Sequence, residues 1–304
     1  MDSALQHLNQ QFAIPGQLAF EAGPGGFLMA VINNAHASAT MTLAGGHVMS
    51  YAPTGQHPVL WVSPNASWTL GQAMRGGVPV CWPWFALHPT DPRGKPLHGL
   101  VRTMLWEVKS TRALPDGSTE VVMETSNTPE TLAIWPHAFA LEVTATFGPR
   151  LRVAWSARNT GAEPFEYTGA LHPYYAVSDI ADIRIHGLDG TDYLDKNDAL
   201  KRKTQHGPLR ITEPIDAIFL DTTAELVVED PGLRRKLHIA KRGSHTSVVW
   251  NPYEKDAQMP DVGAGQHQHF FCAEAANAAQ DTVTVAPGEA GHLMMEIWVE
   301  EMDA

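Results

Sequence analysis

Short runs in which apolar and polar residues alternate recur along most of the chain. The clearest extends from Leu141 to Phe147 and, after Gly148-Pro149-Arg150, resumes from Leu151 to Ser156. A period of two places side chains alternately on the two faces of a strand, so this segment predicts a β-hairpin. Shorter runs that predict strands lie at 37–43, 47–51, 105–111, 119–125, 226–229, 237–240, 283–285 and 293–299. The pattern therefore favours a chain built from many short antiparallel strands.

Only the start of the chain shows a helical spacing. Leu5, Leu8 and Phe12 lie three and four residues apart, which is the spacing of one face of a helix. We expect a helix over residues 3–11, within a peripheral N-terminal segment of residues 1–15.

Turn-forming residues separate the predicted strands throughout. The 25 Gly and 22 Pro are spread along all 304 residues, without a linker or an internal repeat. Two large antiparallel sheets packed face to face accommodate so many strands. We therefore expect one all-β domain over residues 1–304, a large sandwich with few short helices. The polar, Pro-rich segment 86–97 is expected to be a loop that carries ligand contacts.

Composition narrows the partners and the compartment. A hydrophobic content of 44% supplies a large core, and a net charge of −12 disfavours nucleic acid and anionic membranes. An anionic ligand would need a local cationic pocket. Cys81 and Cys272 have no metal-type spacing, and neither a signal peptide nor an apolar run of about 20 residues is evident. We expect a cytoplasmic protein, a monomer or a weak homodimer, that does not associate with membranes.

The densest cluster of candidate chemistry lies between residues 71 and 106. Arg75 precedes two glycines, and Arg102 follows His98-Gly99. Two arginines can bind a phosphate or carboxylate through charge-assisted hydrogen bonds, and interleaved tryptophans such as Trp82 are a common lining of small-molecule sites. Alternatively, the arginines form surface ion pairs and the tryptophans belong to the core.

Two further residues are candidates for acid–base chemistry. His172 lies at the end of a predicted strand, immediately before Pro173, and Glu274 is an isolated acid in the apolar run 270–276. A histidine can donate a proton near neutral pH, and a carboxylate in apolar surroundings is paired, catalytic or exposed. A structural histidine and a solvent-facing glutamate are the alternatives.

Other patterns give little support for a cofactor or a metal. His267 and His269 would share one side of a strand, but no third ligand has a suitable spacing. Phosphate-binding loops and nucleophile elbows are not found. We expect no cofactor and no metal, and a reaction that needs only proton transfer.

Together, these segments resemble the hexose-6-phosphate mutarotases, also called glucose-6-phosphate 1-epimerases. The resemblance extends over most of the chain, and any one of its motifs alone would be weak. Its segments are Arg75-Gly76-Gly77-x-Pro79, Pro83-x-Phe85, His98-Gly99-x-x-Arg102, Leu171-His172-x-Tyr174, Asp216, Trp250-Asn251-Pro252-x-x-Lys255 and Phe271-Cys272-x-Glu274.

The resemblance implies a galactose-mutarotase-like β-supersandwich and interconversion of the anomers of a hexose 6-phosphate, with glucose 6-phosphate as the expected substrate. It implies His172 and Glu274 as the catalytic pair. The substrate-binding residues that we predict are Arg75, Arg102, Asp216, His98, Leu97 and Trp82. Arg75 and Arg102 are expected near the substrate phosphate, while Lys255 has no assigned role.

Leu97 departs from the family, which often has Gln before the His-Gly pair, and this leaves the hexose preference open. Glu274 is expected to take the C1 hydroxyl proton and His172 to protonate the ring oxygen. A nearby carboxylate such as Asp216 is a candidate to raise the pKa of His172; the alternative is that Asp216 only binds substrate. A mutarotase of unphosphorylated aldoses and a non-catalytic sugar-binding module remain the alternative functions.

Overall fold

The computed structural model describes residues 2–302 of the chain, which fold into antiparallel sheets with little helix. Every pairing between named strands in this range is antiparallel. The prediction of an all-β sandwich with few short helices is therefore confirmed. Within residues 2–302, neither α-helix has the length and apolar composition that a membrane crossing requires.

Two sheets have eight strands each. The site sheet, so named for the cavity described below, has the order β15-β14-β16-β19-β20-β11-β5, and β12 also pairs with β20. Its strands are β5 (Val80–Cys81), β11 (Gly169–Leu171), β12 (Tyr174–Ala176), β14 (Asp192–Asp195), β15 (Lys201–Thr204), β16 (Ile215–Phe219), β19 (Thr246–Asn251) and β20 (Phe270–Asn277).

The second large sheet, the back sheet, has the order β13-β17-β18-β22-β9-β8-β7-β6. Its strands are β6 (Glu107–Ala113), β7 (Thr119–Ser126), β8 (Phe139–Phe147), β9 (Leu151–Asn159), β13 (Arg184–His186), β17 (Leu226–Asp230), β18 (Arg235–Arg242) and β22 (Ala290–Glu301). The predicted hairpin is β8–β9, in which Phe147 pairs with Leu151 across the turn.

Smaller elements complete the fold. A four-stranded sheet comprises β1 (Leu18–Ala22), β2 (Leu28–Asn33), β3 (Ala37–Thr42) and β4 (His47–Pro53), and β10 (Phe165–Tyr167) pairs with β21 (Val283–Val285). The α-helices are α1 (Asp2–Phe12) and α2 (Pro129–Ile134). The 3-10 turns are η1 (Pro24–Gly26), η2 (Val101–Thr103), η3 (Lys196–Asp198), η4 (Tyr253–Gln258) and η5 (Gln266–His269).

The expected N-terminal helix is confirmed as α1, which is docked on the sheets. Leu8 lies in the main core, and the Asn9 side chain exchanges two hydrogen bonds with the backbone of Phe20, both of 2.8 Å. Thr111 donates a hydrogen bond of 2.6 Å to the Phe12 carbonyl. These contacts fasten the helix to β1 and β6.

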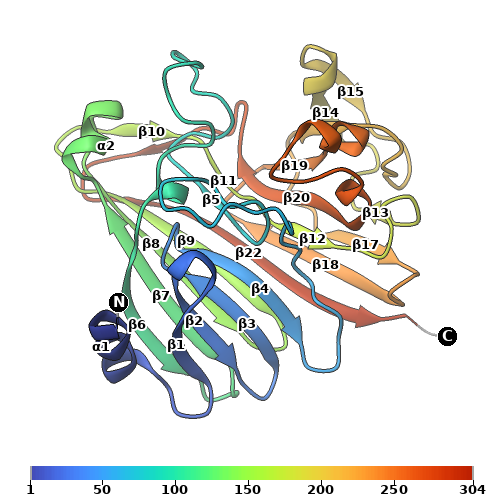
Figure 1. The fold of residues 1–304 in the computed structure, drawn as a ribbon. Helices are drawn as coiled ribbons and strands as arrows, with labels where there is room; N and C mark the ends of the chain where they lie inside the picture. The colour runs from blue at the N-terminus through green and yellow to red at the C-terminus, as the bar shows by residue number, and fades with distance from the viewer. Residues whose placement is uncertain (1, 303–304) are drawn as a thin grey trace.

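Both large sheets and the four-stranded sheet contribute to one main hydrophobic core. In Figure 1 the four-stranded sheet and the site sheet lie side by side against the long strands of the back sheet. Strand β20 explains how the site is built. Phe271, Ala273 and Ala275 alternate into the main core, so the residues between them face the opposite side of the site sheet. Glu274 therefore points away from the main core, although all eight residues of β20 are buried.

Candidate active site

A cavity of about 450 Å³ lies over the site sheet, where four of its strands and the loop after β5 meet. His172 directly follows β11, Glu274 lies in β20, and Asp216 lies in β16. The residues that line it are Arg75, Phe85, Ala86, Leu87, Leu97, His98, His172, Lys196, Asp216, Trp250, Met259 and Glu274. Loop 86–97, teal in Figure 1, and the yellow β14–β15 hairpin rise from the same end of the molecule.

His172 and Glu274 form a buried pair in this cavity. His172 Nε2 lies 3.3 Å from Glu274 Oε1, and the two side chains are only 8% and 1% exposed. The Tyr174 ring stacks on His172 at 5.1 Å and 13°. Within residues 2–302, His172 Nδ1 and Glu274 Oε2 lack hydrogen-bond partners. A buried polar atom without a partner calls for an explanation, and these two belong to residues that line a cavity, so both atoms are candidates to contact a ligand.

Burial favours the neutral form of each member of this pair. It lowers the pKa of His172 to about 3, and the positive charges of Arg75 and Arg102 act in the same direction. Burial also raises the pKa of Glu274 well above 4.5, and the nearby charge of Asp216 raises it further. Burial therefore favours the state in which the imidazole is neutral and the carboxyl group carries the proton that the pair can exchange.

The expectation that Asp216 raises the pKa of His172 was wrong. Asp216 Oδ2 instead forms an ion pair of 2.7 Å with Lys196 Nζ, and cations dominate the field at His172. Their effect adds to the desolvation of the imidazole. Asp216 does line the cavity, where its charge acts on Glu274.

Arg75 lies in the cavity wall in a fixed orientation. Its Nε and Nη2 donate to one carboxylate oxygen of Asp261 at 2.9 and 2.7 Å, and its Nη1 donates to the Tyr174 hydroxyl at 2.9 Å. Its guanidinium also lies 5.8 Å from the centre of the Trp250 ring. Arg75 is thus the predicted arginine that the structure brings to the cavity.

Of the other predicted binding residues, His98 and Leu97 line the cavity and Arg102 contacts its wall. His98 lines the cavity, and its Nδ1 accepts a hydrogen bond of 3.1 Å from the Ala86 amide. Leu97 also lines the cavity, whereas Arg102 does not: its Nη2 donates to the Leu97 carbonyl at 2.6 Å. Arg102 therefore supports the backbone of the cavity wall at Leu97.

The structure places Trp82 in the core, away from the cavity. The side chain is fully buried and contacts the rings of Trp135, Phe139, Phe165 and Tyr167. For Trp82 the alternative that the tryptophans belong to the core is therefore correct. Trp82 directly follows the short strand β5, and its side chain points towards the back sheet. The Trp82 carbonyl still contributes to the loop by accepting a hydrogen bond of 2.9 Å from the Leu100 amide.

The His267 and His269 pair does not lie on a strand, as its spacing suggested. Both residues belong to η5, where His267 is buried with its Nδ1 2.7 Å from Asp256, and His269 is exposed. A 3-10 turn, with three residues per turn, does not place alternate residues on one side. Among residues 2–302, no group of three or more His, Cys, Asp or Glu side chains could hold a metal ion.

Lys196 is the cavity residue that sequence reasoning missed. It lies in the charged run 192–203, which has the composition of a solvated surface, and nothing in its spacing sets it apart from its neighbours. Trp250 and Met259 also line the cavity without having been predicted as site residues. Trp250 was visible only as part of a motif, and Met259 carried no signal.

Known proteins show the same fold and sequence pattern. The family model described as aldose 1-epimerase matches residues 29–298. A protein of Escherichia coli (strain K12), provisionally named glucose-6-phosphate 1-epimerase, is 33% identical over 274 residues, which cover 88% of this chain and 89% of the relative. A Cenchrus ciliaris protein with the same provisional name is 31% identical, over 88% of this chain and 83% of the relative.

Solved structures agree with this assignment. The crystal structure of a provisionally named mutarotase from Salmonella typhimurium superposes with a TM-score of 0.88 at 27% identity, over 95% of this chain and 96% of the other. A galactose mutarotase-like protein from Lactobacillus casei, at 14% identity, shares the fold with a TM-score of 0.73, over 90% of this chain and 100% of the other. The chain therefore belongs to the aldose 1-epimerase family and has the galactose mutarotase-like fold.

Proposed function

We propose that this chain is an isomerase that interconverts the α and β anomers of a hexose 6-phosphate, with glucose 6-phosphate as its substrate. The observation that carries this proposal is the buried His172–Glu274 pair, in a cavity whose more exposed wall bears the cations Arg75 and Lys196. The names of the two relatives described above support the same substrate class.

The reaction needs one proton acceptor and one proton donor. Glu274 takes the proton of the C1 hydroxyl as the C1–O5 bond breaks, and His172 gives a proton to O5. Rotation about C1–C2 in the open-chain aldehyde then presents the other face of C1. On ring closure Glu274 returns its proton to O1, and His172 takes the proton from O5. Both residues end as they began, so no cofactor is required.

The proton state that burial favours differs by one proton transfer from the state that opens the ring. Burial places the shared proton on Glu274, whereas ring opening starts with the proton on His172. The 3.3 Å contact between the two side chains provides the route for this transfer.

The other predicted residues position the sugar. Arg75 is proposed to bind the phosphate, while Asp216 and His98 offer polar groups to the ring hydroxyls. Arg102 contributes by holding the loop backbone at Leu97. Remote binding energy from the phosphate then holds C1 and O5 against the catalytic pair.

Anomer exchange measured by NMR tests this function. The wild-type protein is expected to accelerate exchange of glucose 6-phosphate, and to act far less on unphosphorylated glucose at the same concentration. Equal acceleration of both sugars would support the alternative, an aldose 1-epimerase without phosphate specificity. Binding of glucose 6-phosphate without acceleration would indicate a non-catalytic sugar-binding module.

A further inference from the structure

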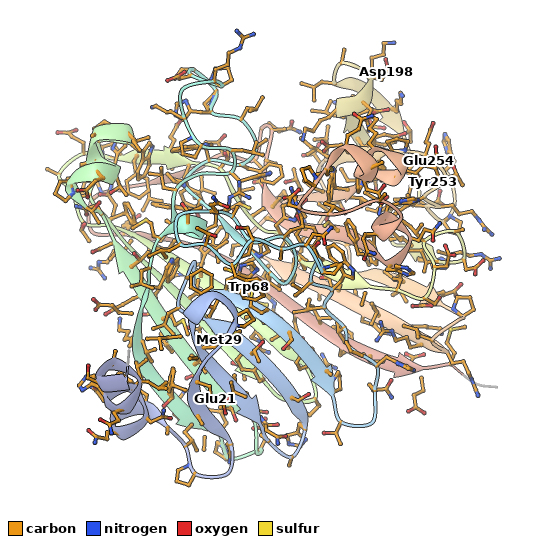
Figure 2. All side chains as sticks on the ribbon, viewed as in Figure 1. Glu21, Met29, Trp68, Asp198, Tyr253 and Glu254 are labelled. Carbon is orange, nitrogen blue, oxygen red and sulfur yellow. The ribbon has the colours of Figure 1, made fainter. Side chains whose placement is uncertain are left out.

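The β14–β15 hairpin places Lys196 at the edge of the cavity. In the ladder between β14 and β16, Leu194 pairs with Ile218 and Asp195 with Ala217, so the next position sets Lys196 opposite Asp216. The Asp195 side chain accepts a hydrogen bond of 2.9 Å from the Asn197 amide and fixes the turn η3 that follows. Figure 2 labels Asp198, the last residue of η3, at the far tip of this hairpin. The position of Lys196 is therefore set by strand register.

Lys196 is less constrained by its partners than Arg75. Three of the five N–H donors of Arg75 bond Asp261 and Tyr174, which fixes the orientation of the guanidinium and leaves two donors for a ligand. Within residues 2–302, Asp216 is the one ion-pair partner of Lys196, whose side chain is 28% exposed. An ammonium group carries more N–H donors than a single carboxylate oxygen takes up. Lys196 can thus bind an anion without leaving Asp216.

The charges of the cavity require such a group. Asp261 already offsets Arg75, and Asp216 offsets Lys196, so the wall has little net positive charge within a chain of net charge −12. An incoming dianion therefore gains from each cation that retains free donors, and Lys196 adds such a cation to Arg75. Asp216 is proposed to contact the ring hydroxyls, and Lys196 is paired with it in the same cavity, so this one ion pair would contact both ends of a phosphorylated sugar.

We propose that Lys196 is a specificity-determining residue that binds the substrate phosphate while still paired with Asp216, and thereby selects phosphorylated over free hexoses. This inference rests on the proposed function and adds to it a residue that the family resemblance did not supply.

Lys196 also acts on the catalytic pair through its charge. Glu274 faces His172, Asp216, Lys196 and the buried thiols of Cys81 and Cys272. Among these groups the charge of Lys196 lowers the pKa of Glu274, and it also lowers the pKa of His172. Loss of the lysine charge should therefore move both limbs of the pH–rate profile to higher pH, an effect that a purely structural residue would not produce.

The test compares Lys196→Met with Lys196→Arg and with a matched control, Lys255→Met. Lys255 is exposed and contacts η3 from outside the cavity, where its Nζ lies 3.3 Å from Asn197 Oδ1. We expect Lys196→Met to raise KM for glucose 6-phosphate on the order of 10- to 100-fold, the loss of a charge-assisted hydrogen bond. Lys196→Arg should recover most of this loss, and Lys255→Met should stay within about twofold of wild type.

A second arm separates this proposal from the function itself. Inorganic phosphate is titrated into wild type and Lys196→Met by calorimetry, in the absence of sugar. Weaker phosphate binding by the variant supports the proposal even if wild type shows no exchange activity, an outcome that would overturn the proposed function alone. Equal phosphate binding by both proteins, or a KM that Lys196→Met leaves unchanged, would overturn the proposal for Lys196.

Discussion

At the scale of single residues, the site depends on charges placed where burial opposes them. Glu274 illustrates this, since its carboxyl group is nearly inaccessible and its pKa is raised well above 4.5 by burial and by Asp216. Such a group is a stronger base than an ordinary glutamate once it has given up its proton, and burial favours its protonated form. The environment that makes it reactive also makes its charge costly for the folded protein.

This cost predicts a pH-dependent effect of Glu274→Gln on stability. The folded protein binds the Glu274 proton more tightly than the unfolded chain, so stability from this group is present below the unfolded pKa and is lost as pH rises through the folded pKa. The Glu274→Gln variant has no carboxyl group at this position, so it does not undergo this loss of stability as pH rises. Its Tm should therefore exceed that of wild type by more at about pH 8 than at about pH 5. A Tm difference that does not change with pH would contradict the raised pKa.

His172 predicts the opposite trend. Its folded pKa of about 3 lies below the ordinary histidine value of 6.5. Its stability contribution is therefore present above the unfolded pKa and is lost as pH falls towards the folded value. His172→Gln should therefore lose less stability than wild type on acidification from about pH 7 to about pH 4. Urea denaturation at several pH values measures this. A steeper loss in the variant would show that the histidine is charged in the fold.

At the scale of elements, two glycines hold the Arg75 segment against β4. The Gly76 carbonyl is 2.8 Å from His47 Nε2, and Gly77 has a φ of +63°. A Cβ atom at Gly77 would lie 2.3 Å from the Val48 carbonyl oxygen. Only glycine permits this close approach of the backbone.

Gly77→Ala should therefore lower stability by about 1–3 kcal/mol or more, and should raise KM by displacing the neighbouring Arg75. Gly71→Ala is the matched control, since Gly71 has a φ of +83° but open space around its Cβ position. Denaturant unfolding and steady-state kinetics measure both effects. If Gly77→Ala and Gly71→Ala change stability and KM equally, the effect comes from the positive φ that both glycines share. The close approach of Gly77 to the Val48 carbonyl would then not matter.

The sequence pattern predicted strands well where one face of the strand is buried and the other face is not. Strand β8 alternates buried and partly buried positions over all nine residues, which is why its hairpin was evident. Strand β20 is buried on both faces, so its pattern could not show which way Glu274 points. Lys196 could not be predicted, because the ladder between β14 and β16, which places it opposite Asp216, is a long-range pairing. The same applies to Trp82, whose burial depends on tertiary contacts.

At the scale of the whole molecule, both large sheets and the four-stranded sheet share one core. We therefore propose that the chain forms a single domain, as expected from the sequence. Thermal unfolding followed by far-UV circular dichroism and by tryptophan fluorescence should give coincident transitions. Separate midpoints for the two probes would instead indicate two independently unfolding units.

The central claim is that the His172–Glu274 pair interconverts the anomers of a hexose 6-phosphate. Glu274→Gln keeps the shape of the side chain and removes the proton acceptor, so its exchange rate with glucose 6-phosphate, measured by NMR, tests this claim most directly. The account predicts a loss of about 10²- to 10⁴-fold relative to wild type, with the fold retained by circular dichroism. An exchange rate equal to that of wild type would contradict it.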